Sequence, residues 1–394
     1  MSSTVVSRNS DLKRLRDEGY DVSVKRGYLF VKDVPLVNEQ REIGRGTLVS
    51  TLALSGETVE RPETHVVMLI GEYPCAEDGT PIAQLKHDGA KDLGGGLKVD
   101  FSFSNKPAGG FADYHAKMTH YASIIEGPAQ AIAPHMTAKT FPPFAADQDE
   151  DTPFRYTDTA TSRANIGAIN ERLKLARVAI VGEGGTGSYV LDFVAKTPVR
   201  EIHLFDDDHF SSHNAFRSPG AASLTELQAR PSKVAYLTEI YDKMRTGIVA
   251  HETALTADNV GALEGMDFVF LCIDESAAKA PIVEALERME ISFVDVGMGL
   301  DTGGGALGGI VRTTVSTPVR REVLHENVSL GDAAGEGEYD TNIQIAELNA
   351  LNAALAVVKW KKHYGFYRDY SATMNSSFTI DTEALAREGR SDEA

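Results

Sequence analysis

The chain has 394 residues, of which 42% are hydrophobic and 24% are charged, and its formal net charge is −18. This composition is typical of a globular protein, and the length predicts two domains. The acidic balance argues against nucleic acid as the main partner, because nucleic-acid binding depends on lysine and arginine contacts to phosphate.

Residues 1–145 have the pattern of a small β-rich α+β domain. Its four β-type runs, separated by glycine, proline and charged residues, are YLFVKDV, TLVSTLAL, THVVMLIGEYP and LKVDFSFS. One helix is expected over DLKRLRDEG and another within DYHAKMTHYASIIEGPAQAI. The stretch FPPFAADQDEDTPF, with three prolines and a cluster of acids, then predicts a linker, which we set at residues 146–158.

From residue 159 the pattern changes to alternating strands and helices. The expected strands are RVAIVG, EIHLFD, GIVAHETAL, DFVFLCID and ISFVDVGM, and the expected helices are SYVLDFVAK, SKVAYLTEIYDKM and AAKAPIVEALERM. This alternation predicts an α/β domain with a parallel sheet covered on both faces. A long core helix follows, with its buried face formed by Leu348, Leu351, Leu355 and Val358. We expect the domain to end at residue 382 and residues 383–394 to form a flexible tail.

Hydropathy and cysteine usage bear on the location of the protein. The sequence has no run of about 18 apolar residues, so no membrane span is expected. The N-terminal stretch has no apolar core, and we do not expect a secretory signal. The only two cysteines, Cys75 and Cys272, argue against a disulfide scaffold and exclude a four-cysteine zinc site. A cytoplasmic location is the simplest expectation.

Four glycines follow the first strand of the second half and open its first helix. Gly182, Gly184, Gly185 and Gly187 read G-x-G-G-x-G. In this position glycines allow a tight turn and bring backbone N–H groups close to a phosphate at a helix N-terminus. The spacing also fits many dinucleotide dehydrogenases, and a turn needed only for packing the strand against the helix remains an alternative.

Polar residues beyond the glycine loop distinguish between the reactions that this site could support. Asp206 ends the second predicted strand, where an acid can accept hydrogen bonds from a ribose. Asn214, Arg217, Lys233 and Asp274 follow in order along the same predicted fold. Hydride transfer has no evident use for this set. A triphosphate site does, because arginine and lysine neutralise phosphate charge and an aspartate at a strand end can hold Mg²⁺.

Together these motifs resemble those of the ThiF/MoeB family of adenylyltransferases, the bacterial relatives of ubiquitin-activating enzymes. The matching features are GEGGTGS at 182–188, the D-x-D of Asp206 and Asp208, the N-x-x-R of Asn214 and Arg217, and the single residues Lys233 and Asp274. The resemblance covers about residues 160–380. The whole chain is also similar to bacterial ThiF-type proteins that carry an additional N-terminal domain and are associated with ubiquitin-like proteins.

The resemblance implies a reaction and a role for each residue. ATP would bind with its phosphates on the glycine loop, and the C-terminal carboxylate of a partner protein would attack the α-phosphate. Asp206 would hold the ribose, and Asp274 would bind Mg²⁺. The residues implied to contact the phosphates are Asn214, Arg217 and Lys233. Family members are usually homodimers in which an arginine before the first strand reaches the neighbouring site; Arg163 is our candidate, and Arg172 lies nearby.

The sequence departs from the family where many members carry a nucleophilic cysteine, because the segment after VDVGMGL has none. Cys272 falls within an apolar strand and is expected to pack, and the same is expected of Cys75 at a predicted turn. Three routes remain open. The adenylate passes directly to a second protein, Cys75 takes the acyl group, or a hydroxyl takes it. The candidate hydroxyls are those of Thr302, Thr313, Thr314 and Ser316.

We therefore predict a Rossmann-like ThiF/MoeB adenylation domain preceded by a smaller β-rich domain. Its predicted function is ATP- and Mg²⁺-dependent adenylation of a ubiquitin-like protein in a bacterial conjugation pathway. The expected partners are that carrier protein, a conjugating-enzyme-like acceptor and a second copy of the chain, and the N-terminal half is interpreted as a recognition domain. The alternatives are activation of a sulfur-carrier protein, an NAD-dependent oxidoreductase and a non-catalytic scaffold.

Overall fold

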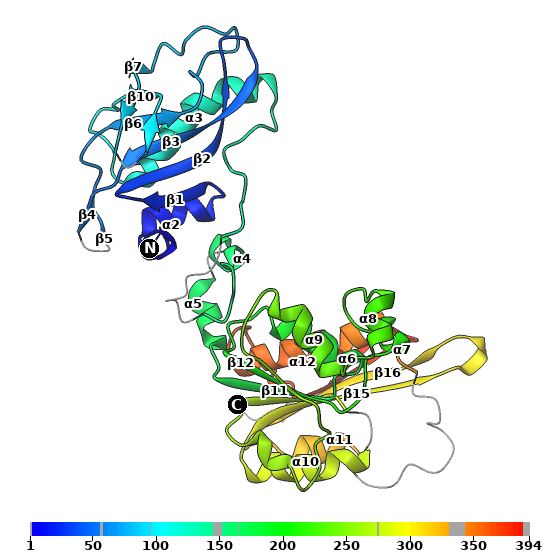
Figure 1. The fold of residues 1–394 in the computed structure, drawn as a ribbon. Coiled ribbons are helices and arrows are strands. Elements are labelled where there is room, and N and C mark those ends of the chain that lie inside the picture. The colour runs from blue at the N-terminus through cyan, green and yellow to red at the C-terminus, as the bar shows by residue number, and fades with distance from the viewer. Residues whose placement is uncertain are drawn as a thin grey trace. The chain divides into compact units, whose positions relative to one another are not determined.

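The chain folds into two compact units, Met1–Asp151 with Tyr156–Asn165, and Thr152–Arg155 with Ile166–Ala394 (Figure 1). The computed structural model describes residues 2–55, 58–94, 96–144, 152–164, 166–273, 276–330 and 343–388. Residues 146–151 of the predicted linker lie outside these ranges, and residues after them group partly with each unit. No helix among the described residues combines the length and the apolar character needed to cross a lipid bilayer.

The first unit is built on a six-stranded antiparallel sheet in the order β1-β2-β3-β6-β10-β7. Its strands are β1 (Asp21–Lys25), β2 (Tyr28–Val37), β3 (Ile43–Thr51), β6 (Val66–Ile70), β7 (Lys86–Asp88) and β10 (Phe101–Ser104). Two short pairs are β4 (Leu54–Ser55) with β5 (Thr58–Val59), and β8 (Lys91–Asp92) with β9 (Lys98–Val99).

One long helix, α3 (Tyr114–Ile132), packs on β2 and closes the core of this unit. It begins at Asp113, whose side chain accepts a hydrogen bond from the Ala116 N–H, a standard N-cap. Helices α1 (Ser2–Arg8) and α2 (Ser10–Asp17) pack beside the sheet, and α4 (Thr159–Arg163) also belongs to this unit. The predicted β-rich α+β fold is thus confirmed.

The second unit contains an eight-stranded sheet in the order β13-β12-β11-β14-β15-β16-β17-β18. The strands from β13 to β15 are parallel neighbours and those from β15 to β18 are antiparallel neighbours. The bounds are β11 (Arg177–Val181), β12 (Glu201–Phe205), β13 (Ile248–His251), β14 (Phe268–Leu271), β15 (Ser292–Asp301), β16 (Gly308–Ser316), β17 (Asn375–Thr379) and β18 (Ala384–Glu388).

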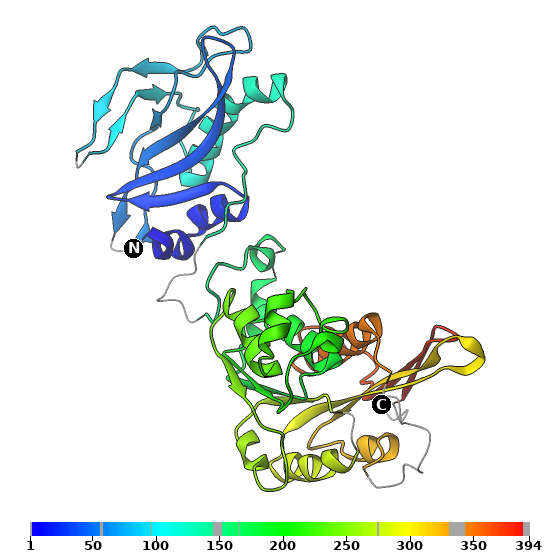
Figure 2. The ribbon, with the colours of Figure 1, turned by 45° about the vertical axis from the view of Figure 1, so that its right-hand side comes forward.

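Helices cover both faces of this sheet, as predicted. Figures 1 and 2 show α6, α9 and α12 on one face and α10 and α11 on the other. Their bounds are α6 (Gly185–Val194), α9 (Lys233–Asp242), α10 (Ser276–Arg288), α11 (Glu322–Asn327) and α12 (Ala346–His363). The remaining helices are short, namely α5 (Gly167–Asn170), α7 (Ser212–Ala215), α8 (Leu224–Ala229) and the 3₁₀ turns Glu171–Leu173, Val260–Leu263 and Gly303–Gly305.

The register of the parallel strands shows which residues meet at one edge of the sheet. Val181 of β11 lies opposite Phe205 of β12 and Leu271 of β14. These strands therefore end together, and the residues that follow each of them meet at one edge of the sheet.

Two sequence predictions were wrong in this unit. The buried face of α12 is not the leucine face, since Val358 is 38% exposed and the buried residues include Asn349, Asn352, Ala353, Ala356 and Trp360. Small and amide side chains face inward because α12 packs closely on α6. The predicted flexible tail is in part a strand, because β18 pairs with β17.

Candidate functional site

The glycine loop between β11 and α6 is shaped by contacts that only glycine permits. Gly182 has φ +92°, and a Cβ there would lie 2.8 Å from the Cys272 carbonyl oxygen. A Cβ on Gly187 would lie 1.8 Å from the Gly182 carbonyl oxygen, and one on Gly185 would lie 2.0 Å from Asn349 Nδ2. Packing alone therefore accounts for three of the four glycines.

Gly184 is different, and it points to a ligand. Its φ is −74°, which any residue adopts, and a Cβ there would meet nothing within 4 Å. Packing against the described residues gives no reason for glycine at this position. Gly184 is the N-cap of α6, a ten-residue helix whose first N–H groups have no intrahelical partner. A close approach of an anion to these groups is the physical reason that remains.

An acidic and basic cluster lies beyond the end of β12. Asp206 Oδ2 accepts the Glu183 N–H at 2.7 Å, which ties the glycine loop to this strand end. Lys233, the first residue of α9, places its Nζ 3.2 Å from Asp206 Oδ1 and 2.7 Å from Asp208 Oδ2. The hydrogen bond from Lys233 lowers the pKa of Asp208. The structure thus brings together the glycine loop, Asp206, Asp208 and Lys233.

Asn214 and Arg217 lie in and after the short helix α7, in the loop that follows Asp208. Asn214 Oδ1 accepts the Ser211 N–H at 3.0 Å, so the amide oxygen holds the start of this turn. Asn214 is 1% exposed, and its Nδ2 has no hydrogen-bond partner within the described part of the chain. The Arg217 Nε and the Ser218 hydroxyl are also buried and have no hydrogen-bond partner among the described residues. Unpaired buried donors are costly, and an anionic ligand would satisfy them.

Two predicted residues cannot be placed. Asp274 lies outside the described residues, and so does the side chain of Arg163, whose backbone ends α4. Over the described ranges, no cluster of three or more histidine, cysteine, aspartate or glutamate side chains could hold a metal ion. The assignment of Mg²⁺ to Asp274 therefore stays a prediction. Arg172, the other arginine considered, is exposed and donates to the Gly365 carbonyl.

Two residues of the site were missed by the sequence reasoning. Glu183 is 1% exposed, and neither carboxyl oxygen has a hydrogen-bond partner among the residues that the structure describes. Burial, and then the charge of Asp206, raise the pKa of Glu183 well above its ordinary value. The position of Glu183 within the glycine motif is the sequence signal that could have identified it. Asn349 on α12 accepts the Thr186 hydroxyl at 3.0 Å, and no sequence signal linked residues 163 positions apart.

The candidate acyl acceptors are mostly buried. Cys75 is 0% exposed, and burial raises the pKa of its thiol, so a reactive thiolate is disfavoured. Cys272 belongs to the core around β14, as predicted. Three of the four hydroxyls are also 0% exposed, those of Thr313, Thr314 and Ser316. Thr302 is exposed, at the turn between β15 and β16.

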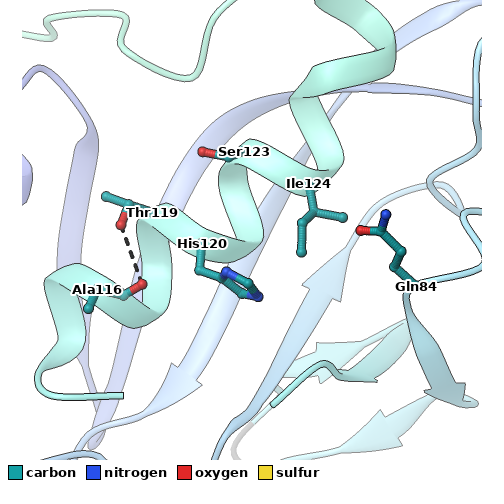
Figure 3. Close-up of a pocket in the computed structure, with 6 residues that line it drawn as sticks. All are labelled: Gln84, Ala116, Thr119, His120, Ser123 and Ile124. Atoms are coloured by element: carbon teal, nitrogen blue, oxygen red, sulfur yellow. Dashed lines mark hydrogen bonds between the residues drawn. The ribbon is translucent and has the colours of Figure 1, made fainter. Parts of the chain in front are cut away.

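A pocket of about 630 Å³ lies in the first unit. It is lined by Gln84, Ala116, Thr119, His120, Ser123 and Ile124 (Figure 3). His120 Nε2 lies 3.0 Å from Asn105 Oδ1, and burial lowers the pKa of His120. In Figure 3 the Ser123 hydroxyl points away from the His120 ring, so these two side chains do not form a nucleophile and base pair.

Two different family models match the N-terminal and C-terminal parts of the chain. Residues 160–327 match the model of the ThiF family, and residues 10–159 match DUF6791, a domain of unknown function. The chain is 26% identical over 152 residues to ubiquitin-like modifier-activating enzyme 5 of Culex quinquefasciatus, covering 35% of this chain and 38% of that protein. The same enzyme of Drosophila persimilis is 28% identical over 151 residues, covering 36% and 39%. The chain thus spans well under half the length of these relatives.

Among solved structures, Escherichia coli MccB is 17% identical, with 56% of this chain and 63% of that chain covered and a TM-score of 0.47. The structure of selenomethionine PaaA is 14% identical, with coverage of 56% and 75% and a TM-score of 0.43. The family match covers the glycine loop, Asp206, Lys233 and the parallel strands that position them. Residues 160–327 of this chain are a ThiF family domain.

Proposed function

We propose that this chain is an adenylyltransferase that uses ATP to activate the C-terminal carboxylate of a ubiquitin-like protein in a bacterial conjugation pathway. The observation that carries the proposal is the glycine loop, whose open position at Gly184 sits at the start of α6 beside the Asp206 and Lys233 pair. Similarity of the ThiF domain to ubiquitin-like modifier-activating enzyme 5 supports a protein carboxylate as the substrate.

In the proposed reaction, the triphosphate lies on the glycine loop and the ribose is held by Asp206. The unpaired donors of Asn214 and Arg217, together with Lys233, stabilise the negative charge that develops on the phosphates. A carboxylate oxygen of the partner attacks the α-phosphorus, and the bond to the bridging oxygen breaks to release pyrophosphate. Mg²⁺ supplies further neutralisation of the phosphates, and Asp274 is the residue that we propose to hold it.

Three partners belong to the proposal. The carrier protein brings the carboxylate, and a conjugating-enzyme-like protein accepts the activated acyl group. A second copy of the chain contributes Arg163 to the site of its neighbour. We assign recognition of the carrier or the acceptor to residues 1–145, the β-rich domain. Because Cys75 is buried, the proposal favours release of the adenylate to another protein over formation of a thioester on this chain.

The test is exchange of radiolabelled pyrophosphate into ATP by the purified chain with candidate ubiquitin-like proteins. Exchange should require a carrier with an intact C-terminus and should be lost with a carrier shortened by its last residue. Asp274→Ala should lower exchange by roughly a hundredfold or more, while its neighbour Glu275→Ala serves as the matched control.

Absence of exchange with every ubiquitin-like protein encoded near this chain would contradict the proposed substrate. Hydride transfer by an NAD-dependent enzyme cannot produce pyrophosphate exchange, so a positive result also excludes that alternative.

A further inference from the structure

Both oxygens of Asp206 already accept hydrogen bonds from the chain itself. Oδ1 accepts the Asp208 N–H at 2.9 Å and lies 3.2 Å from Lys233 Nζ. Oδ2 accepts the Glu183 N–H at 2.7 Å and lies 3.3 Å from the same Nζ. Of the roughly four acceptor positions of a carboxylate, three are taken by hydrogen bonds from the chain, and the Lys233 ammonium lies against both oxygens. Asp206 therefore cannot accept hydrogen bonds from both hydroxyls of a ribose while Lys233 stays where it is.

Lys233 is held on a second side by Asp208. Its Nζ lies 2.7 Å from Asp208 Oδ2, the shorter of its carboxylate contacts, and the Lys233 N–H also donates to the Asp208 carbonyl at 2.9 Å. The Lys233 side chain is 8% exposed, whereas that of Asp208 is 73% exposed. The Lys233 ammonium therefore contacts two carboxylates. Of these, the exposed Asp208 carboxylate can lose the contact and be hydrated at little cost in free energy.

We propose that Lys233 and the nucleotide compete for Asp206, and that Asp208 is a positioning residue that holds Lys233 in the competing position. The inference rests on the proposed function. Nucleotide binding then exchanges partners: Lys233 leaves both carboxylates for the phosphates, and the ribose hydroxyls take its place on Asp206. The two backbone N–H donors from Glu183 and Asp208 stay on Asp206 throughout and keep its carboxylate oriented.

The buried acid of the glycine loop makes this exchange feasible. Three carboxyl groups lie in this region: those of Asp206 and Asp208 contact the Lys233 ammonium, and that of Glu183 is affected by the charges of Asp206 and Lys233. If all were ionised, removing Lys233 would leave a cluster of like charges in a buried place. Burial raises the pKa of Glu183 and so favours its neutral form, which lessens the negative charge left in the interior, and Asp208 is exposed to water. Departure of Lys233 therefore uncovers one buried charge, which the ribose hydroxyls and the two amides solvate.

The exchange predicts opposite responses to ATP and to adenosine, which carries the ribose without the phosphates. Asp208→Asn weakens the hold on Lys233 and should tighten ATP binding about two- to fivefold, since an ion pair with an exposed carboxylate contributes about 1 kcal/mol at most, which corresponds to a factor of about five. Lys233→Met removes the competitor and a phosphate contact together. It should tighten adenosine binding about three- to tenfold and weaken ATP binding by at least as much.

Titration calorimetry at pH 8 with ATP and with adenosine measures both effects on the full chain. The matched controls are Asp207→Asn, an exposed neighbour of Asp208, and Lys243→Met, an exposed lysine at the end of α9; both should bind like the unmodified chain. Thermal melting checks that each variant is folded. Should Lys233→Met unfold, the exposed position of Asp208 keeps Asp208→Asn as the deciding variant.

The outcomes separate this inference from the proposed function. Tighter ATP binding by Asp208→Asn, with the opposite shifts of Lys233→Met, supports the exchange. ATP binding by Asp208→Asn that equals or falls below that of the unmodified chain overturns the inference alone. Adenosine binding that does not improve in a folded Lys233→Met does the same. If none of the proteins binds ATP, the proposed function fails and the inference fails with it.

Discussion

Gly187 and Gly184 lie three residues apart in one loop, but glycine is needed at each position for a different physical reason. A Cβ on Gly187 would overlap the Gly182 carbonyl oxygen at 1.8 Å, so the backbone of the turn itself requires glycine. A Cβ on Gly184 would enter open space. Substitution of Gly187 should therefore affect the stability of the fold, and substitution of Gly184 should affect ligand binding.

We expect Gly187→Ala to lower the free energy of unfolding by roughly 3 kcal/mol or more, because the overlap forces the backbone to move. Gly184→Ala should change that free energy by about 1 kcal/mol at most, the difference between glycine and alanine at an N-cap. The same variant should weaken ATP binding about tenfold or more, because its methyl group occupies the approach to the N–H groups of α6. Urea unfolding and titration calorimetry measure the two quantities. Unchanged ATP affinity in Gly184→Ala would show that the loop does not approach the phosphates.

At the level of elements, α12 shows how packing overrides a hydrophobic pattern. The spacing of Leu348, Leu351, Leu355 and Val358 is helical, and the helix is present, but a different face is buried. The inward face carries Ala353 and Ala356, both 0% exposed, next to Trp360. Small residues let α12 approach α6, and Trp360 fills the space between the helix and Phe270 of β14, with ring centroids 5.8 Å apart.

The corrected face of α12 leads to a paired prediction. Ala353→Leu should lower the free energy of unfolding of the second unit by about 1–3 kcal/mol, because the added side chain has no space against α6. Leu351→Ala, on the half-buried face, should cost less than about 1.5 kcal/mol. Denaturant unfolding followed by Trp360 fluorescence reports on both variants. A larger loss from Leu351→Ala than from Ala353→Leu would mean that the leucine face is covered after all.

The elements that the sequence predicted share one property: their signals are local. The strands β11, β12 and β14 are short apolar runs between glycines and charges, and each ends where a site residue follows. Gly182 and Asp206 were therefore identified together, since parallel strands end at one edge. The antiparallel strands β16 to β18 were not predicted. The pairing of β16 with β17 joins residues about 60 to 70 positions apart and depends on the partner strand rather than on a local pattern. Asn349 was missed for the same reason.

Each of the two units of the molecule has a buried lysine without a carboxylate partner in the structure as described. In the first unit, Lys117 Nζ donates to Ser50 Oγ at 2.9 Å and to the Thr64 carbonyl at 2.7 Å. In the second, Lys359 Nζ donates to the Thr373 carbonyl at 3.0 Å. Burial lowers the pKa of each lysine from 10.5 to about 8.

Both units should accordingly become more stable between pH 8 and about 10. In this range the unfolded chain keeps these lysines protonated while the folded chain releases the protons, so the free energy of unfolding rises with pH. A pKa lowered from 10.5 to about 8 corresponds to at most about 3 kcal/mol for each lysine. Above pH 10 the raised pKa values of buried tyrosines such as Tyr20 and Tyr364, both about 12, act in the opposite direction.

Urea unfolding at pH 7.5 and 9.5 measures this gain. Lys117→Met should remove it from the first unit and Lys359→Met from the second, while the exposed Lys25→Met should leave both unchanged. Equal pH dependence in all four proteins would mean that neither lysine loses its proton on folding in this range.

The hydrogen bond between Thr186 and Asn349 joins residues 163 positions apart, and it has a consequence for how the protein is made. A ribosome releases the glycine loop long before it releases α12, so the loop emerges without the helix that packs on it. Contacts of such long sequence separation slow folding, because the intervening chain must first be ordered. The first unit, whose contacts close within residues 1–165, can fold while synthesis continues. We therefore expect the glycine loop to reach its final shape late in folding, and a chain that terminates before residue 346 would present it without Asn349.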